Sequence, residues 1–203
     1  MKKIIFILVI LIVIIYFQYQ SINEINNSFE ILQYDNPNKS IFENMVNDKL
    51  ISVFTNIKLT KKPKQSLNEV VKNSLNYYNI PLSVESNYDI ISEKEGHTSL
   101  IKRQDKYRRL IYVLKGEKRI IIFNNEQKNN LYLKNNNVSL INIFNQDLEK
   151  YPLINKLKYV EIIVRENNMV FIPYNFYFCS ICDSDVQTVD FYSESIFSKF
   201  LKN

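Results

Sequence analysis

The chain has 203 residues, of which 46% are hydrophobic and 13% aromatic. This composition excludes a wholly disordered chain and allows one domain with a substantial core. The net charge is +5, and Lys2 and Lys3 supply two of these charges, which leaves +3 for the rest of the chain. Because the charges are interspersed and form no basic stripe, we expect no nucleic-acid partner.

An apolar run from Ile4 to Phe17 follows the two lysines. As a helix it is about 21 Å long, and extension through Tyr19 with snorkelling lysines brings it closer to the ~30 Å hydrocarbon core. The residues after the run are bulky, whereas a cleaved signal peptide ends in small ones. We therefore expect residues 1–19 to form a retained signal anchor, a single-pass transmembrane helix, with cleavage as the alternative. The positive-inside rule places the amino terminus in the cytosol and the domain on the extracytoplasmic or lumenal side.

Residues 20–30 are polar and predict a tether, and residues 31–203 predict one domain. Its first half is expected to contain two helices, one strand and a basic loop. Ser66 and Glu69 have the spacing of a capping box at the start of the second helix. The predicted ranges are 37–47 and 66–77 for the helices, 50–57 for the strand and 58–64 for the loop.

The second half of the domain is strand-like. Gly116 and residues 166–168 predict turns between strands, and residues 147–151 predict one helical turn. A last helix is expected at 193–201. Short strands at this spacing predict an antiparallel double-sheet barrel. The expected strands lie after residue 88 and include 109–114, 119–123, 159–165, 169–172 and 186–192.

Five segments occur in a fixed order in this half: GEKRIIIF (116–123), NLYL (130–133), QDLEKYP (146–152), VFIPYNFYF (170–178) and VDFY (189–192). Together they resemble the Jumonji-C and cupin-like family of 2-oxoglutarate oxygenases, in particular its asparaginyl-hydroxylase branch. The resemblance implies a mainly β fold with a few helices, a double-stranded β-helix of the jelly-roll or cupin type, preceded here by the transmembrane helix.

The resembled family binds Fe(II) through two histidines and one carboxylate. Counting back from Gly116 and along the fourth segment places these positions at Arg103, Asp105 and Phe178. Arginine stays protonated and phenylalanine has no lone pair, and His97 is the single histidine of the chain. We therefore expect a degenerate site that holds no metal or other cofactor, filled by an Arg103–Asp105 ion pair.

Three further positions follow from the resemblance. Lys118 matches the lysine that pairs with the distal carboxylate of 2-oxoglutarate, so it is a candidate anion site, with a solvent-directed strand lysine as the alternative. Asp190 replaces an asparagine near the family's site, and a carboxylate there would repel an anionic ligand. Tyr177 belongs to an aromatic run that we expect to fill the core and the pocket.

The two cysteines, Cys179 and Cys182, form one CxxC. A single CxxC cannot build a four-cysteine zinc site. On a strand, residues three apart face opposite ways, so we expect structural cysteines, while a disulfide would require a turn. His97 lies in a polar, glycine-containing segment and predicts a surface histidine.

These observations lead to three hypotheses about function. The first is a membrane-anchored pseudoenzyme, held at the membrane through residues 4–17, that acts as a binding or structural module with a protein partner. The second is an Fe(II)- and 2-oxoglutarate-dependent protein hydroxylase with non-standard ligands. The third is a viral or organellar membrane assembly component. Many proteins of the resembled family dimerise, so a homodimer is a further expectation.

Overall fold

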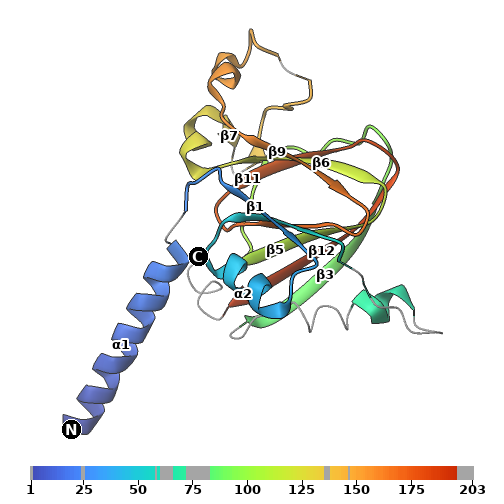
Figure 1. Ribbon diagram of the computed structural model, residues 1–203. Helices are drawn as coiled ribbons and strands as arrows, with labels where there is room; N and C mark the ends of the chain where they lie inside the picture. Colours follow the sequence, from blue (N-terminus) through green and yellow to red (C-terminus); the bar gives the residue numbers. More distant parts are fainter. Residues whose placement is uncertain are drawn as a thin grey trace.

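The computed structural model describes residues 2–23, 26–57, 59, 66–71, 83–134, 138–145 and 147–195. Two six-stranded sheets make up most of this part (Figure 1). All neighbouring strands are antiparallel except β1 and β2, which are parallel. The first sheet has the order β1 (Ile31–Asp35), β2 (Ile51–Thr55), β10 (Met169–Ile172), β5 (Arg108–Lys115), β12 (Val186–Ser195) and β3 (Ser83–Glu93). The second has the order β7 (Leu133–Lys134), β8 (Val138–Ser139), β4 (Lys102–Arg103), β11 (Tyr177–Cys182), β6 (Glu117–Phe123) and β9 (Val160–Arg165).

The central core lies between the two sheets. It combines Ile111 and Val113 of β5 with Ile120 and Ile122 of β6 and with Phe178 of β11. Because successive side chains of a strand point to opposite faces, the residues between these positions pack on the outer sides of the sheets. This explains why β5 and β6 read as nearly continuous apolar runs: each is buried on both faces.

Helical segments cover the outer faces. On the first sheet, α2 (Lys39–Asn47) buries Phe42 and Val46, and the Asn38 side chain caps it by accepting from the Ile41 amide. A helical segment at 67–71 adds Val71 to the same cluster. On the second sheet, the cluster takes in Leu131, next to η1 (Asn125–Asn130), and Ile154 of η2 (Pro152–Lys156).

Several local predictions are confirmed. The capping box is present, since the Ser66 amide donates to Glu69 at 3.0 Å and the Glu69 amide donates to the Ser66 hydroxyl at 3.3 Å. Gly116 has φ +84 and Asn167 has φ 63, so both turns use left-handed backbone. Each of these turns carries the chain from one sheet to the other, because β5 and β10 belong to the first sheet and β6 and β9 to the second.

Other predictions are corrected or lie outside the described residues. Residues 193–195 continue β12, where the sequence predicted the start of a helix. They stay extended because all three pair with β3, and Ser193 pairs with Arg108 of β5 as well. Residues 196–203, most of the basic loop 58–64 and the second half of the helix predicted at 66–77 lie outside the described part. Strands β1, β4, β7 and β11 were not among the predicted ranges.

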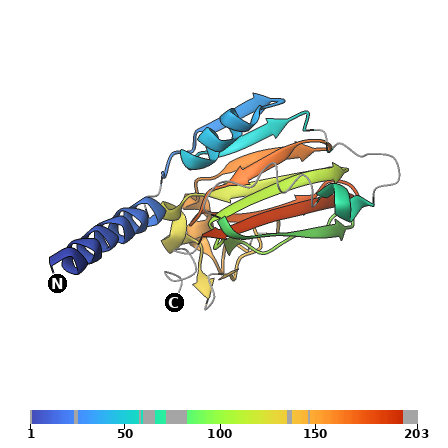
Figure 2. The same ribbon diagram turned by 90° about the horizontal axis from the view of Figure 1, so that it is seen from below.

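At the amino terminus, α1 (Lys2–Asn23) stands away from both sheets (Figures 1 and 2). Its apolar side chains are exposed on every side, from Ile4 at 63% to Phe17 at 66%. The helix continues to residue 23, into the segment predicted as a tether. A search of the described residues finds no helix with the length and apolar content needed to cross a membrane.

Candidate functional site

Two of the residues expected at the degenerate metal site, Arg103 and Phe178, lie on the adjacent strands β4 and β11 of the second sheet. β11 pairs with β4 so that Phe178 lies opposite Lys102 and Tyr177 lies opposite Arg103. Phe178 belongs to the core between the sheets, whereas Tyr177 belongs to the cluster on the outer face. Lys102, rather than Arg103, is therefore the neighbour of Phe178 inside the barrel.

Two cations flank the Phe178 ring. The Nζ atom of Lys102 lies 5.2 Å from the ring centroid and the Cζ atom of Arg109 lies 4.9 Å from it. Both distances are in the range of a cation–π contact. Burial lowers the pKa of the Lys102 ammonium, and the neighbouring Arg109 charge lowers it further. Among the described residues, no carboxylate lies within ion-pair distance of Lys102.

Asp190 faces the barrel interior and is held by Arg109. The Arg109 Nε donates to both carboxylate oxygens, at 3.0 and 3.1 Å, and Nη2 donates to Oδ2. The two side chains are 14% and 6% exposed. The carboxylate is thus neutralised by a forked, charge-assisted contact and is not left to repel or to bind a ligand.

Lys118 also points inward, and the residue is 7% exposed. Its ammonium pairs with the Glu93 carboxylate, whose other oxygen contacts His97. Burial alone would raise the pKa of Glu93, but the contacts with Lys118 and His97 outweigh it, so the pKa is lowered. The expected anion position is therefore taken by a carboxylate of the protein itself.

The remaining predicted residues lie apart from this interior. Asp105 is exposed, and no Arg103–Asp105 ion pair occurs among the described side chains. Tyr177, expected in the pocket, is fully buried in the outer cluster of the second sheet, and its hydroxyl has no hydrogen-bond partner in the described part of the chain. The alternation of side chains along β11 is the reason, because Phe178 takes the inward position.

The interior residues do not fit the iron centre that the resemblance implies. Such a centre needs neutral imidazoles and an available carboxylate. Around Phe178 the chain supplies Lys102 and Arg109, which would repel a cation, and the Asp190 carboxylate is already bound to Arg109.

The cysteines and the histidine lie as predicted, but the histidine makes a contact that the sequence analysis missed. Cys179 packs in the outer cluster and Cys182 in the central core, so they face opposite ways, and both are free thiols. Burial raises the pKa of Cys179 to about 12. His97 has a 54% exposed side chain, as expected, but its Nδ1 lies 3.0 Å from Glu93. The sequence analysis did not link His97 to Glu93, four residues before it, or to Cys182. The antiparallel bridge of Thr98 to Ile181 and the neighbouring backbone hydrogen bonds bring residue 97 beside residue 182.

Comparisons with known proteins agree with this architecture. The family model of the cupin-like domain matches residues 20–182. The human tRNA wybutosine-synthesizing protein 5 is 36% identical over 64 residues, which are 32% of this chain and 20% of that protein. The mouse protein of the same name is 38% identical over 58 residues, or 29% of this chain and 18% of that protein. The matched region thus spans about a fifth of these relatives.

Two solved structures are similar to part of the chain. The coconut allergen cocosin has a TM-score of 0.36 with 9% identity and matches 54% of this chain and 22% of its own. Procruciferin, an 11S globulin from Brassica napus, has a TM-score of 0.34 with 12% identity over the same shares. The family match extends over most of the chain and includes every strand of the two sheets except β12. The chain belongs to the family of cupin-like domains.

Proposed function

We propose that the protein is a membrane-associated cupin-like module that acts through binding and not through 2-oxoglutarate-dependent oxidation. One observation carries this proposal: Phe178, with Lys102 and Arg109 both within cation–π distance of its ring, stands where an oxygenase of the resembled family would need a metal-binding histidine. Two positive charges beside an aromatic ring disfavour Fe(II) by Coulomb repulsion and offer it no lone pair.

An oxygenase with non-standard ligands is the competing function. It would need Asp105 and a second donor to converge on one cavity. Asp105 is exposed, and both oxygens of Asp190, the inward carboxylate on the strand next to Arg109, are engaged by that arginine. The Lys118 ammonium is paired with Glu93, so we expect that it does not bind a carboxylate of 2-oxoglutarate. These contacts favour the binding module.

The membrane part of the proposal rests on α1. A helix whose apolar residues are exposed all round has no protein surface to bury them, and a lipid phase would remove them from water. Lys2 and Lys3 at its start support a cytosolic amino terminus, with the domain on the other side. A protein partner or a second copy of the chain would then bind the exposed surface of the domain.

A role in membrane assembly is a narrower form of the same proposal. A role in tRNA modification, which the names of the similar proteins suggest, is a separate alternative. The wybutosine-synthesizing relatives match over about a fifth of their length. The charged surface here mixes signs, as in the contacts of Arg119 with Asp183 and Glu161. We therefore expect no binding to tRNA.

Succinate release tests the absence of oxygenase activity. The full chain, purified in detergent, would be incubated with Fe(II), ascorbate, oxygen and 2-oxoglutarate, and succinate would be quantified against a protein-free sample. We expect equal succinate in both. Iron-dependent succinate in excess of the protein-free sample would overturn the proposal. A circular dichroism spectrum of the same preparation verifies that it is folded.

A further inference from the structure

Three side chains of the kinds that bind metals converge where β3 and β11 end. Glu93 is the last residue of β3, His97 lies in the turn that follows, and Cys182 is the last residue of β11. One carboxylate oxygen, one imidazole nitrogen and the cysteine sulfur all lie within 4.8 Å of one another. The site is separate from Phe178, since Cys182 pairs with Lys118 and Phe178 with Ile122 further along the same ladder.

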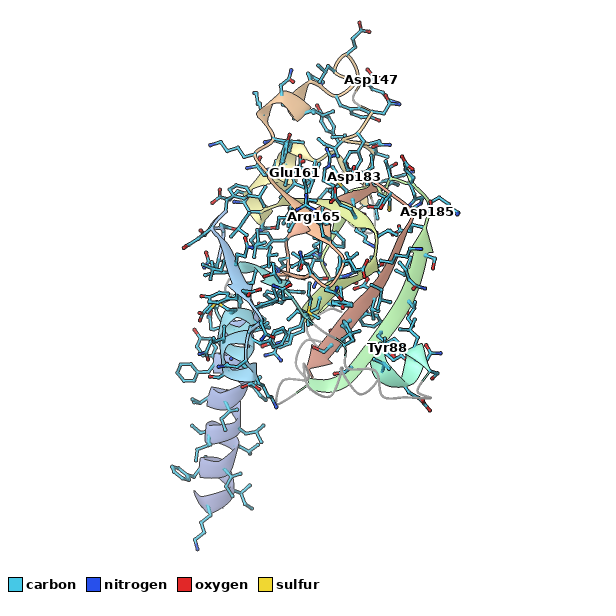
Figure 3. The ribbon with its side chains drawn as sticks, turned by 45° about the vertical axis from the view of Figure 1, so that its right-hand side comes forward. Tyr88, Asp147, Glu161, Arg165, Asp183 and Asp185 are labelled. Carbon is cyan, nitrogen blue, oxygen red and sulfur yellow. The ribbon has the colours of Figure 1, made fainter. Side chains whose placement is uncertain are left out.

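The backbone holds these donors in register. The Gly96 amide donates to the Cys182 carbonyl at 2.8 Å, and the Cys182 amide donates to the His97 carbonyl at 3.0 Å. Asp185 ties the same turn to the start of β12, because its carboxylate accepts from Lys94 Nζ at 2.7 Å and from the Glu95 amide at 3.0 Å. Figure 3 shows Asp185 where β12 begins beside the end of β3. The position of His97 relative to Cys182 is therefore fixed by the main chain.

We propose that Glu93, His97 and Cys182 form a zinc site. Thiolate, imidazole and carboxylate are the three ligand types that Zn²⁺ takes in proteins, and three protein ligands leave the fourth tetrahedral position to water. Tetrahedral binding places donors about 3.5 Å apart, and the Nδ1 of His97 is already 3.0 Å from Glu93. The half-exposed imidazole ring is the donor free to adjust.

The donors lie near solvent, and one of them is held in place by a neighbouring side chain. A pocket of about 310 Å³ has Glu93 in its wall, together with Asp185 and Val186, and the His97 side chain is 54% exposed. Lys118 binds the Glu93 oxygen that does not contact His97, so it fixes the orientation of the carboxylate. Such outer contacts are a regular part of protein metal sites. On binding, the Cys182 thiol would lose its proton to solvent and coordinate as thiolate.

Cobalt and zinc titrations of the full chain test the site directly. Co²⁺ added to chelator-treated protein in detergent is expected to produce a thiolate-to-cobalt charge-transfer band that saturates at one Co²⁺ per chain and is reversed by Zn²⁺. Cys182→Ser should abolish the band. Cys179→Ser is the matched control, since it removes a buried cysteine from the opposite face of the same strand and should leave the band unchanged.

A second variant guards against misfolding of the cysteine mutants. His97→Asn alters an exposed side chain, so its thermal unfolding without metal should equal that of the wild type. Its Zn²⁺ dissociation constant should rise by more than about 100-fold, because even changes to outer contacts cost 10- to 100-fold. The absence of a band in the wild type, a band that survives Cys182→Ser, or unchanged Zn²⁺ affinity in His97→Asn would each overturn the proposal. None of these readouts depends on oxygenase turnover.

Discussion

The Arg109 Nε donates hydrogen bonds to both carboxylate oxygens of Asp190 inside the barrel, at 3.0 and 3.1 Å. The two residues lie on the neighbouring strands β5 and β12, two residues apart in register and so on the same face, since Asp190 pairs with Ile111 and Arg109 with Tyr192. The same guanidinium contacts the Phe178 ring. Arg109 thus neutralises the buried Asp190 carboxylate and also contacts the Phe178 ring.

Removal of the Asp190 carboxylate should destabilise the fold strongly. Asp190→Leu leaves the Arg109 charge buried without its partner, and we expect a loss of about 3–5 kcal/mol in the free energy of unfolding. Urea unfolding followed by circular dichroism measures it. Asp183→Leu, which removes the partner of the exposed Arg119, should cost much less. The double variant Arg109→Met/Asp190→Leu should recover most of the loss, and equal stabilities of Asp190→Leu and wild type would contradict this account.

Tyr112 should make stability fall at high pH. Burial, with a smaller effect of Glu166, raises the pKa of its phenol from 10.0 to about 12, and the hydroxyl lies 3.0 Å from the Ile57 carbonyl and from Asn167 Oδ1. Between these pH values the unfolded chain loses the proton first, so the unfolded state binds fewer protons and the free energy of unfolding decreases with pH. The loss should reach about 2–3 kcal/mol. Unfolding of wild type and Tyr112→Phe from pH 9 to 12 should show a shallower slope for the variant; parallel slopes would argue against it.

Gly116 should tolerate no side chain. It has φ +84, and a Cβ atom there would lie 2.4 Å from the Asp185 carbonyl oxygen. Gly116→Ala is expected to cost more than the roughly 1 kcal/mol of left-handed backbone alone. Gly96 gives the matched comparison, since it has φ +78 and nothing within 4 Å of a Cβ. Gly96→Ala should therefore show only the backbone cost in thermal unfolding without metal, and equal losses at the two sites would refute the steric argument.

Membrane attachment should depend on the apolar surface of α1. Ile7 and Ile14 are 61% and 51% exposed, and each lysine placed there should weaken insertion by about 2.5–3.5 kcal/mol. Alkaline carbonate extraction of expressing cells should leave the wild type in the membrane pellet and release Ile7→Lys/Ile14→Lys. Leu140→Lys is the control, since Leu140 is 52% exposed on the domain and its change should not alter fractionation. Complete release of the wild type would contradict the proposed attachment.

Most strands could be predicted from the sequence because their signal is local. The β-rich runs of β5, β6, β9 and β10 and the turns at Gly116 and Asn167 are set by residues close together in the chain. The spacing of these runs predicted the two-sheet arrangement that they adopt, and the family resemblance implied it as well. The last helix was predicted from its apolar spacing, but residues 193–195 pair as strand, which is a tertiary effect that spacing cannot show.

The sites were harder to predict because they depend on strand register. Counting residues back from Gly116 selected Arg103, whereas the pairing of β4 with β11 puts Lys102 opposite Phe178. A shift of one residue turns a strand's side chains to the other face. The group of Glu93, His97 and Cys182 joins two residues four apart with a cysteine 85 positions further on, and a spacing motif does not predict this pairing.

Iron binding by the barrel interior is the most direct test of the central claim. The double variant His97→Asn/Cys182→Ser removes two of the three donors of the proposed zinc site and leaves the residues around Phe178 unchanged. Anaerobic equilibrium dialysis of this variant against Fe(II), with and without 2-oxoglutarate, measures the iron retained per chain. The account predicts no iron in excess of the buffer compartment under either condition, and one iron per chain would contradict it.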